Sequence, residues 1–400
     1  MRRMTQPRAI TLVTTLAVLV ACGPTVQTAS APVPAAHPPV TVQVPLATPP
    51  AAPAASSTSL PTKLSDADYW KLEQNISEPG GYFRIEDNYT SNEGEVGQIY
   101  TMLREAGVHG GVFIGVGPEQ SFTYIAAIRP RMAFIVDIRR QAVMQHLMFK
   151  AMFELAADRA DFISILFAKP RPPGIDTSTT IANIWEAYRT VKTDSALAAK
   201  NYVRVVDRLT KTHGFTFTED ENEKLKAVFY AFYAYGPAIT TRGSGGGGFG
   251  GRSYDFSDLT GFATDAAGVT RSFLSSEDNY RYLKSLQERN LIVPVSGDFG
   301  GPKAIRAIGA YLTEHHGRVS AFYVSNVEQY LDGDNKLQTF YGNVATLPVD
   351  STSVFIRPYS MRRGGMGGPT RSLCPIAAFL KAADAGMVPN NNAALACPTI

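Results

Sequence analysis

Five short apolar runs constrain the fold of this chain more than any other feature. They are GGVFIGVG (110–117), MAFIVDI (132–138), LIVPVSG (291–297), VSAFYVS (319–325) and SVFIRPY (353–359). Continuously apolar strands are buried on both faces, as in a parallel sheet covered by helices. Helical segments separate the runs, and parallel neighbours need such crossovers. We therefore expect an α/β fold with a doubly wound, mostly parallel sheet, spanning residues 65–360.

A helical insertion is expected at about residues 170–265, between the second and third runs. Within it, Thr218 and Glu221 have the spacing of a capping box ahead of an aromatic run. Seven glycines follow between Gly243 and Gly251, and this stretch is either a lid over a pocket or a solvated loop. We expect residues 361–400 to form a loose tail.

The first 21 residues have the organisation of a secretory signal, with a basic start and an apolar run over residues 9–21. Leu19-Val20-Ala21-Cys22 resembles the lipobox of exported bacterial lipoproteins, which implies that Cys22 is lipidated and becomes the mature N-terminus. Gly23 follows instead of Asp, so the resemblance favours the outer membrane. The alternatives are an ordinary secretory signal with a chance cysteine, or a start codon assigned too far upstream.

Residues 22–64 read as a tether between the lipid and the folded domain. No charged residue occurs between Arg8 and Lys63, and proline and alanine dominate. Such a composition favours extended polyproline II over helix or sheet. With a lipid at Cys22 and this tether, we expect the protein to be anchored to a membrane of the cell envelope.

The charge balance and the cysteines exclude some further partners. The chain has 38 basic and 35 acidic residues, so nothing indicates the clustered basic surface that nucleic acids require. Cys374 and Cys397 remain beyond Cys22, and in an oxidising compartment they either form a disulfide or stay as two unpaired thiols. Neither lies in a metal-ligand pattern.

The stretch from residue 110 to residue 140 predicts a nucleoside pocket. Gly115 and Gly117 allow a tight turn after the first strand, and the following helix presents free N–H groups. Asp137 comes 20 residues after Gly117, at the end of the second strand, where a carboxylate can accept both ribose hydroxyls. Gln120 stands where a GxGxxG motif has its third glycine.

Two further strand ends carry candidate site residues. Asp298 and Phe299 follow the third strand and would accept the amino group of an adenine and stack on its ring. Asn326 and Glu328 follow the fourth strand and would face the reacting group, with Glu328 as a general base. Helix capping explains the same residue types equally well.

Taken together, these residues resemble Rossmann-like methyltransferases that use S-adenosylmethionine. The segments EPGGYFRIEDNYTSNE, GVGPEQSFTYIAAIRPRMAFIVDIRRQ and SNVEQYL more closely resemble an uncharacterised bacterial family with a Leptospira representative and a methyltransferase-like fold. The resemblance covers roughly residues 65–360 and implies that Gly115, Gly117, Asp137 and Asp298 line a cofactor pocket. Many methyltransferases have an acidic residue where this chain has Phe113 and Ile114.

The first of those segments precedes the first strand, where methyltransferases often place a segment that covers the substrate. Its polar residues would close over the pocket, or simply form turns; they are Tyr82, Arg84, Asn88, Ser91, Asn92 and Glu93.

Several functions compete for this pattern. The resemblance implies methyl transfer from S-adenosylmethionine, a donor that should be scarce outside the cytoplasm. A non-catalytic binding module that keeps the fold is therefore the alternative. A hydrolase is disfavoured because the chain has neither a GxSxG elbow nor HExxH spacing. A nicotinamide oxidoreductase would need the missing third glycine.

Overall fold

The computed structural model describes residues 59–84, 87–243, 254–357 and 372–400. Cys22, the expected signal peptide, nearly all of the tether and most of the glycine-rich stretch lie outside these residues. Six strands occur in the described part: β1 (Val112–Gly115), β2 (Met132–Asp137), β3 (Ile292–Ser296), β4 (Val319–Tyr323), β5 (Val354–Ile356) and β6 (Leu373–Pro375). The first five lie inside the five apolar runs, so those strands are confirmed.

The strands form one mostly parallel sheet with the order β3-β2-β1-β4-β5-β6. Strands β1 to β5 are parallel to their neighbours, and β6 runs antiparallel to β5 at the edge. The expected α/β class is confirmed. From β1 the chain first builds outward to β3 and then returns to place β4 on the other side of β1. The order therefore reverses between β1 and β4.

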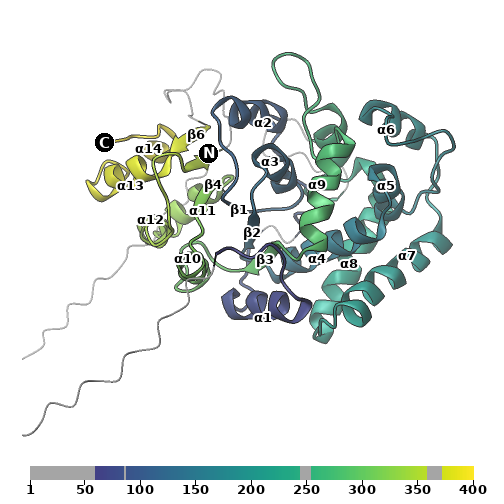
Figure 1. The fold of residues 1–400 in the computed structure, drawn as a ribbon, viewed down its shortest axis with the longest axis horizontal. Coiled ribbons are helices and arrows are strands. Elements are labelled where there is room, and N and C mark those ends of the chain that lie inside the picture. Colours follow the sequence, from purple (N-terminus) through teal and green to yellow (C-terminus); the bar gives the residue numbers. More distant parts are fainter. Residues whose placement is uncertain (1–58, 85–86, 244–253, 358–371) are drawn as a thin grey trace, which may run out of the picture. The chain divides into compact units, whose positions relative to one another are not determined.

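Helices cover both faces of the sheet. In Figure 1, α3 (Gln120–Ile128), α4 (Arg140–Leu155) and α9 (Glu277–Glu288) lie to the right of the strands, and α10 (Ala304–Glu314) and α12 (Leu337–Val344) lie to the left. Three other helices pack at the margins: α1 (Asp66–Ile76), α2 (Val96–Glu105) and α11 (Val327–Gly333). Burial of the strands on both faces follows from this arrangement, and β1 to β4 are buried throughout.

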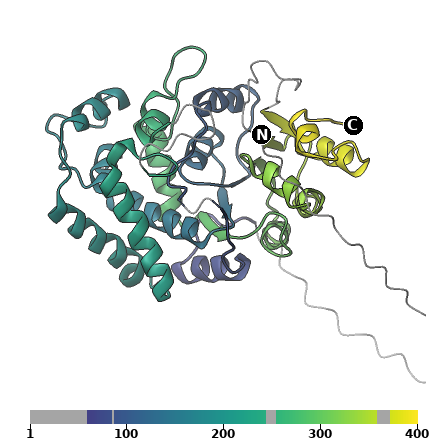
Figure 2. The ribbon, with the colours of Figure 1, turned by 180° about the vertical axis from the view of Figure 1, so that it is seen from behind.

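Helices occupy the region of the expected insertion, between β2 and β3. Its elements include α6 (Ile181–Arg189), α7 (Ser195–Asp207), the π-helical turns Arg208–Thr212 and Asp258–Phe262, α8 (Glu219–Tyr235) and the short 3-10 helix Gly236–Ala238. Thr218 and Glu221 form the predicted capping box at the start of α8. Seen from behind, these helices and the C-terminal elements lie at opposite ends of the domain (Figure 2).

The C-terminal residues 372–400 are packed and do not form the loose tail that we expected. After β6 come α13 (Ile376–Asp384) and α14 (Asn391–Leu395), and a disulfide joins Cys374 to Cys397. Ile376 and Phe379 are fully buried. The pairing of β6 with β5 brings this apolar stretch against the core. The sequence does not reveal this pairing, because β6 is only three residues long and shows no periodic pattern.

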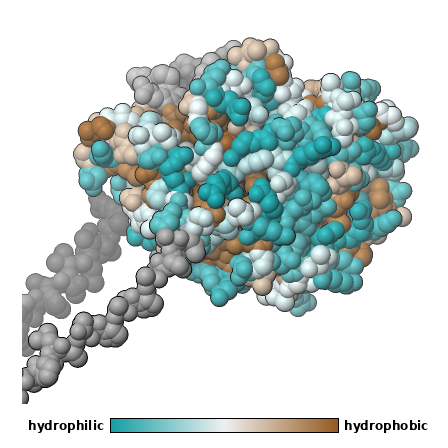
Figure 3. All heavy atoms as spheres, in the orientation of Figure 1, coloured by the Kyte–Doolittle hydropathy of each residue, from teal (hydrophilic) through white to brown (hydrophobic). Residues whose placement is uncertain are grey.

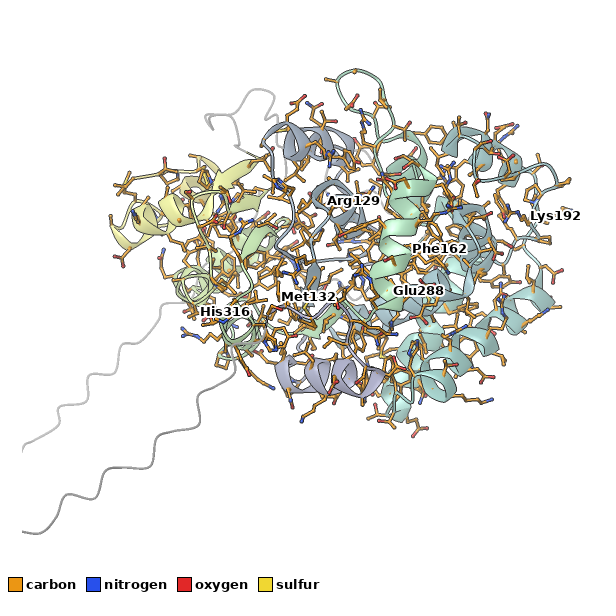
Figure 4. The ribbon with its side chains drawn as sticks, in the orientation of Figure 1. Arg129, Met132, Phe162, Lys192, Glu288 and His316 are labelled. Atoms are coloured by element: carbon orange, nitrogen blue, oxygen red, sulfur yellow. A yellow bond between two sulfur atoms is a disulfide. The ribbon has the colours of Figure 1, made fainter. Side chains whose placement is uncertain are left out.

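An aromatic cluster fills the space between the sheet helices and the insertion. Phe162, on α5 (Arg159–Phe167), lies inside this helical layer (Figure 4) and is 4.7 Å from the ring of Phe153. Phe273 and Tyr280 contact both rings. The outer face seen in Figure 3 is largely hydrophilic, with hydrophobic residues in small scattered groups. Inside, the rings of Phe149 on α4 and Phe232 on α8 meet at a centroid distance of 5.7 Å, so the core is continuous between the sheet helices and the insertion.

Candidate functional site

A cavity of about 460 Å³ opens at the carboxyl ends of β1 to β4. Ligands of open α/β sheets bind at this edge, where the strand order reverses, and the volume is within the range of small-molecule sites. The predicted residues Gly117, Asp137, Asp298, Phe299 and Asn326 all line it. Of the polar residues expected to cover the pocket, five line it as well: Tyr82, Arg84, Asn88, Ser91 and Asn92.

The turn after β1 forms the floor of the cavity. Gly117 has a φ of +78°, a conformation that favours glycine. Gly115 does not line the cavity: a Cβ there would lie 2.6 Å from the ring of Phe113 and 2.7 Å from the Oγ of Ser121. Gly115 therefore allows β1 and α3 to approach closely, whereas Gly117 shapes the binding surface.

His146 on α4 is hydrogen-bonded to this turn. Its Nε2 lies 2.8 Å from the carbonyl oxygen of Gly117, and because a carbonyl only accepts, Nε2 carries the proton. Burial lowers the pKa of His146 to about 4, so the ring is neutral at physiological pH. The adjacent Gln145 donates to the carbonyl of Tyr89 at 2.7 Å. One helix thus holds both the turn at Gly117 and the backbone at Tyr89.

Asp137 lies at the end of β2, as predicted, and is 6% exposed. Its carboxylate accepts hydrogen bonds from Arg139 through Nη2 at 2.8 Å, Nε at 3.0 Å and the backbone N–H at 3.0 Å. A carboxylate offers about four acceptor positions, so a ribose hydroxyl would share it with the arginine. The positive charge of Arg139 thereby compensates the negative charge of Asp137.

Asp298 and Phe299, at the end of β3, differ in their access to the cavity. Asp298 accepts from the Nζ of Lys336 at 2.7 Å and from the N–H of Gly300 at 2.9 Å. Phe299 is only 3% exposed, and its ring stacks on that of Phe340 at a centroid distance of 5.5 Å. Its ring therefore has its main contacts in the core, and little of it is open to an adenine.

Glu328 does not lie at the cavity. The residue is 1% exposed, and its carboxylate accepts two hydrogen bonds from Arg357, at 2.7 and 2.8 Å, and one from Tyr341 at 2.9 Å. A general base must reach the proton that it removes. We therefore assign Glu328 a structural role in place of the predicted catalytic one, while Asn326 remains exposed at the cavity.

Residues 78–84 form a roof over the cavity. The carboxylate of Glu78 accepts from the N–H groups of Lys303 and Ala304, at 2.9 and 2.8 Å, at the start of α10. At the other end of the roof, the ring of Phe83 meets that of Tyr330 on α11 edge to face at 4.9 Å, and Arg84 lies over Tyr330. The roof thus bridges two helices across the carboxyl edge of the sheet.

A second, more open cavity of about 890 Å³ adjoins the first. Both are lined by Tyr82, Phe83 and Arg139, so the roof forms a shared wall. The charged groups of the second cavity include two ion pairs, Arg140 with Glu221 and Lys224 with Asp220. The roof thus separates the two cavities.

Two acidic residues near the cavity, Glu119, which is buried, and Glu93, which is partly buried, were not singled out as site residues by any sequence motif. Glu119 is the N-cap residue of α3 and accepts from the N–H of Ser91 at 3.2 Å, and burial raises its pKa to about 7. Glu93 accepts from Ser325, at the end of β4, and from Gln120 on α3. In the sequence, Glu93 is only one residue of a polar segment. No local pattern predicts its contact with Ser325, which is 232 residues away.

In the residues that the structure describes, no cluster of His, Cys, Asp and Glu has the arrangement of a metal site. No described helix combines the length and apolar character needed to cross a bilayer.

The fold and the cavity define an α/β protein with a ligand-sized site at the carboxyl edge of a mostly parallel sheet. The chain matches a domain of unknown function, DUF7790, over residues 89–229 and 260–373. These ranges make up more than half of the chain, and the protein belongs to this family. They include β1 to β5 and most of the cavity. No curated protein matches the chain.

Proposed function

We propose that this chain is an exported, lipid-anchored bacterial protein whose α/β domain binds S-adenosylmethionine or a related nucleoside and transfers a methyl group. One observation carries the nucleoside site: the left-handed turn at Gly117 and the carboxylate of Asp137 border the same cavity. A turn of this kind lets a ligand approach the backbone, and the carboxylate can accept ribose hydroxyls.

The strand order supports the proposal. The order β3-β2-β1-β4-β5 is that of Rossmann-like folds, whose ligands lie across the β1–β4 switch point. The lining of the cavity includes Asp137 and Asp298 at the ends of β2 and β3, and Ser325 and Asn326 after β4. In this proposal the nucleoside lies over β2 and β3, and the reacting group lies at the end of β4.

The protein's part in such a reaction is mainly alignment. Bound S-adenosylmethionine would supply an electrophilic methyl group. Gly117 and Asp137 would hold the nucleoside, while the roof excludes water and Asn326 contacts the acceptor. Fixing two reactants in line contributes several kcal/mol through proximity alone.

A non-catalytic binding module is the second candidate. The observation that favours it is that three acidic residues expected to act in the site are held in ion pairs: Asp137 with Arg139, Asp298 with Lys336 and Glu328 with Arg357. Carboxylate oxygens that already accept hydrogen bonds from a cation have few acceptor positions left for a substrate. Such a site can bind a ligand without transforming it.

Calorimetric titration with S-adenosylmethionine and S-adenosylhomocysteine tests the nucleoside site. We expect both ligands to bind the unmodified protein, and Asp137→Asn to weaken binding of both. The exposed Asp176, far from the cavity in sequence, offers the control Asp176→Asn. Absence of binding by a folded protein contradicts the nucleoside site. Binding without any methyl transfer to an envelope extract supports the second candidate.

The envelope location has its own support and test. The disulfide between Cys374 and Cys397 suits an oxidising compartment. We expect cells that express the chain to incorporate labelled palmitate into it, and Cys22→Ala to abolish the label. Incorporation that persists in Cys22→Ala contradicts the anchor.

A further inference from the structure

Glu93 is a carboxylate beside the cavity without a positive partner. The cavity residues Asp137 and Asp298 each pair with a cation. Within the described parts of the chain, no Lys or Arg nitrogen lies within ion-pair distance of Glu93, which is partly buried. Charges held away from water are normally compensated by an ion pair or a ligand.

The neighbours of Glu93 are turned toward it. The Oγ of Ser325 donates to one carboxylate oxygen, and the Nε2 of Gln120 donates to the other at 3.2 Å. A carboxylate only accepts, so both neighbours direct their donors at Glu93. The lone pairs of Ser325 Oγ are thereby left for another donor, and Gln120 Oε1 is buried and has no partner among the described residues. Both side chains belong to residues that line the cavity.

The backbone at Ser325 supports a ligand-binding role. Its φ is +47°, in the left-handed region that a residue other than glycine seldom adopts. Such conformations persist where the surroundings impose them, and they concentrate at ligand sites. Here the turn from β4 into α11 places the hydroxyl between Glu93 and the cavity.

The other groups around Glu93 also favour a cation. Tyr323 lines the cavity, and its ring lies 4.9 Å from that of Tyr124. Aromatic faces attract cations. Burial raises the pKa of Glu93, and the nearby negative charge of Glu95 acts in the same direction. A bound positive charge would offset both effects.

We propose that this end of the cavity binds a primary ammonium group of the ligand. An ammonium group has three donors and no acceptor, which matches the acceptors of Ser325 and Gln120 with the charge of Glu93 behind them. The proposal builds on the nucleoside site above, since S-adenosylmethionine carries such a group on its amino-acid portion.

Calorimetry with a matched ligand pair tests this site in the full chain. The pair is S-adenosylhomocysteine and its deamino analogue, in which hydrogen replaces the ammonium group. We expect Glu93→Gln to weaken the binding of S-adenosylhomocysteine on the order of 30-fold. This is the effect of removing one partner of a charge pair that is shielded from water. The affinity of the Glu93→Gln variant for the deamino analogue should equal that of the unmodified protein. Ser320→Ala is the control, because Ser320 bonds to Gly110 at the opposite end of β4.

Equal binding of the two ligands by the unmodified protein overturns the ammonium site, and so does full affinity of Glu93→Gln for S-adenosylhomocysteine. Either result leaves the nucleoside site intact. If neither ligand binds, the proposed function fails instead, and a second measurement still decides the ammonium site. Butylammonium should lower the pKa of the Glu93 carboxyl, followed by carbon-13 NMR, whereas pentanol should not. An unchanged pKa with butylammonium overturns the proposal.

Discussion

The carboxylate of Glu328 and the guanidinium of Arg357 form a fully buried ion pair, with Nε and Oε2 2.7 Å apart. The guanidinium lies between the rings of Phe355 and Phe379, at 4.6 and 4.4 Å from their centroids. Tyr341 completes the group by donating to Glu328. This cluster ties α11 to β5 and to the C-terminal helices.

Glu328→Gln should lower the free energy of unfolding by about 3 kcal/mol, because it leaves the charge of Arg357 unpaired in the interior. Urea denaturation measures the change. The double variant Glu328→Gln, Arg357→Met should lose less than the sum of the two single variants. Ligand affinity should not change, since neither residue lines the cavity. An unaltered unfolding free energy would contradict the structural role.

His146 should make the protein less stable as the pH falls from about 6.5 to about 4. Its pKa is lowered to about 4 in the folded state, so in this range the unfolded chain binds a proton that the folded chain does not. The loss amounts to about 3 kcal/mol. His146→Gln keeps a donor for Gly117 and should remove this part of the pH dependence in urea titrations. A pH profile identical to that of the unmodified protein would show that another group is responsible.

Glu119 should have the opposite effect over a similar pH range. Burial raises its pKa to about 7, so the folded protein holds a proton that the unfolded chain releases above about pH 4.5. Stability is therefore lost as the pH rises from about 4.5 to about 7, by up to about 3 kcal/mol. Glu119→Gln should be more stable than the unmodified protein at pH 8 and equally stable at pH 4. Thermal unfolding at the two pH values measures this difference.

Replacing both Cys374 and Cys397 with serine should lower the free energy of unfolding by about 3 kcal/mol. The disulfide closes a loop over a sequence separation of 23 residues, and its loss gives the unfolded chain more freedom. Denaturation of the unmodified protein with and without reductant should show the same difference. Equal stability in both conditions would mean that the two thiols are not joined in solution.

Much of the architecture could be predicted from local pattern, and the site only in part. The five apolar runs predicted β1 to β5. The glycine turn and the strand ends predicted five cavity residues, namely Gly117, Asp137, Asp298, Phe299 and Asn326. Strand β6 was missed because three residues carry no periodicity. Phe299 and Glu328 were expected to face a ligand, but their side chains have their main contacts in the core.

The sequence by itself determined where the buried strands and helices lie, because apolar runs and capping residues act through neighbours along the chain. Only the tertiary structure decided which carboxylates are neutralised and which are not. Glu328 meets Arg357 and Glu93 meets Ser325 through contacts that span 29 and 232 residues. Electrostatic partners are selected by distance in space, and the folded sheet alone sets that distance.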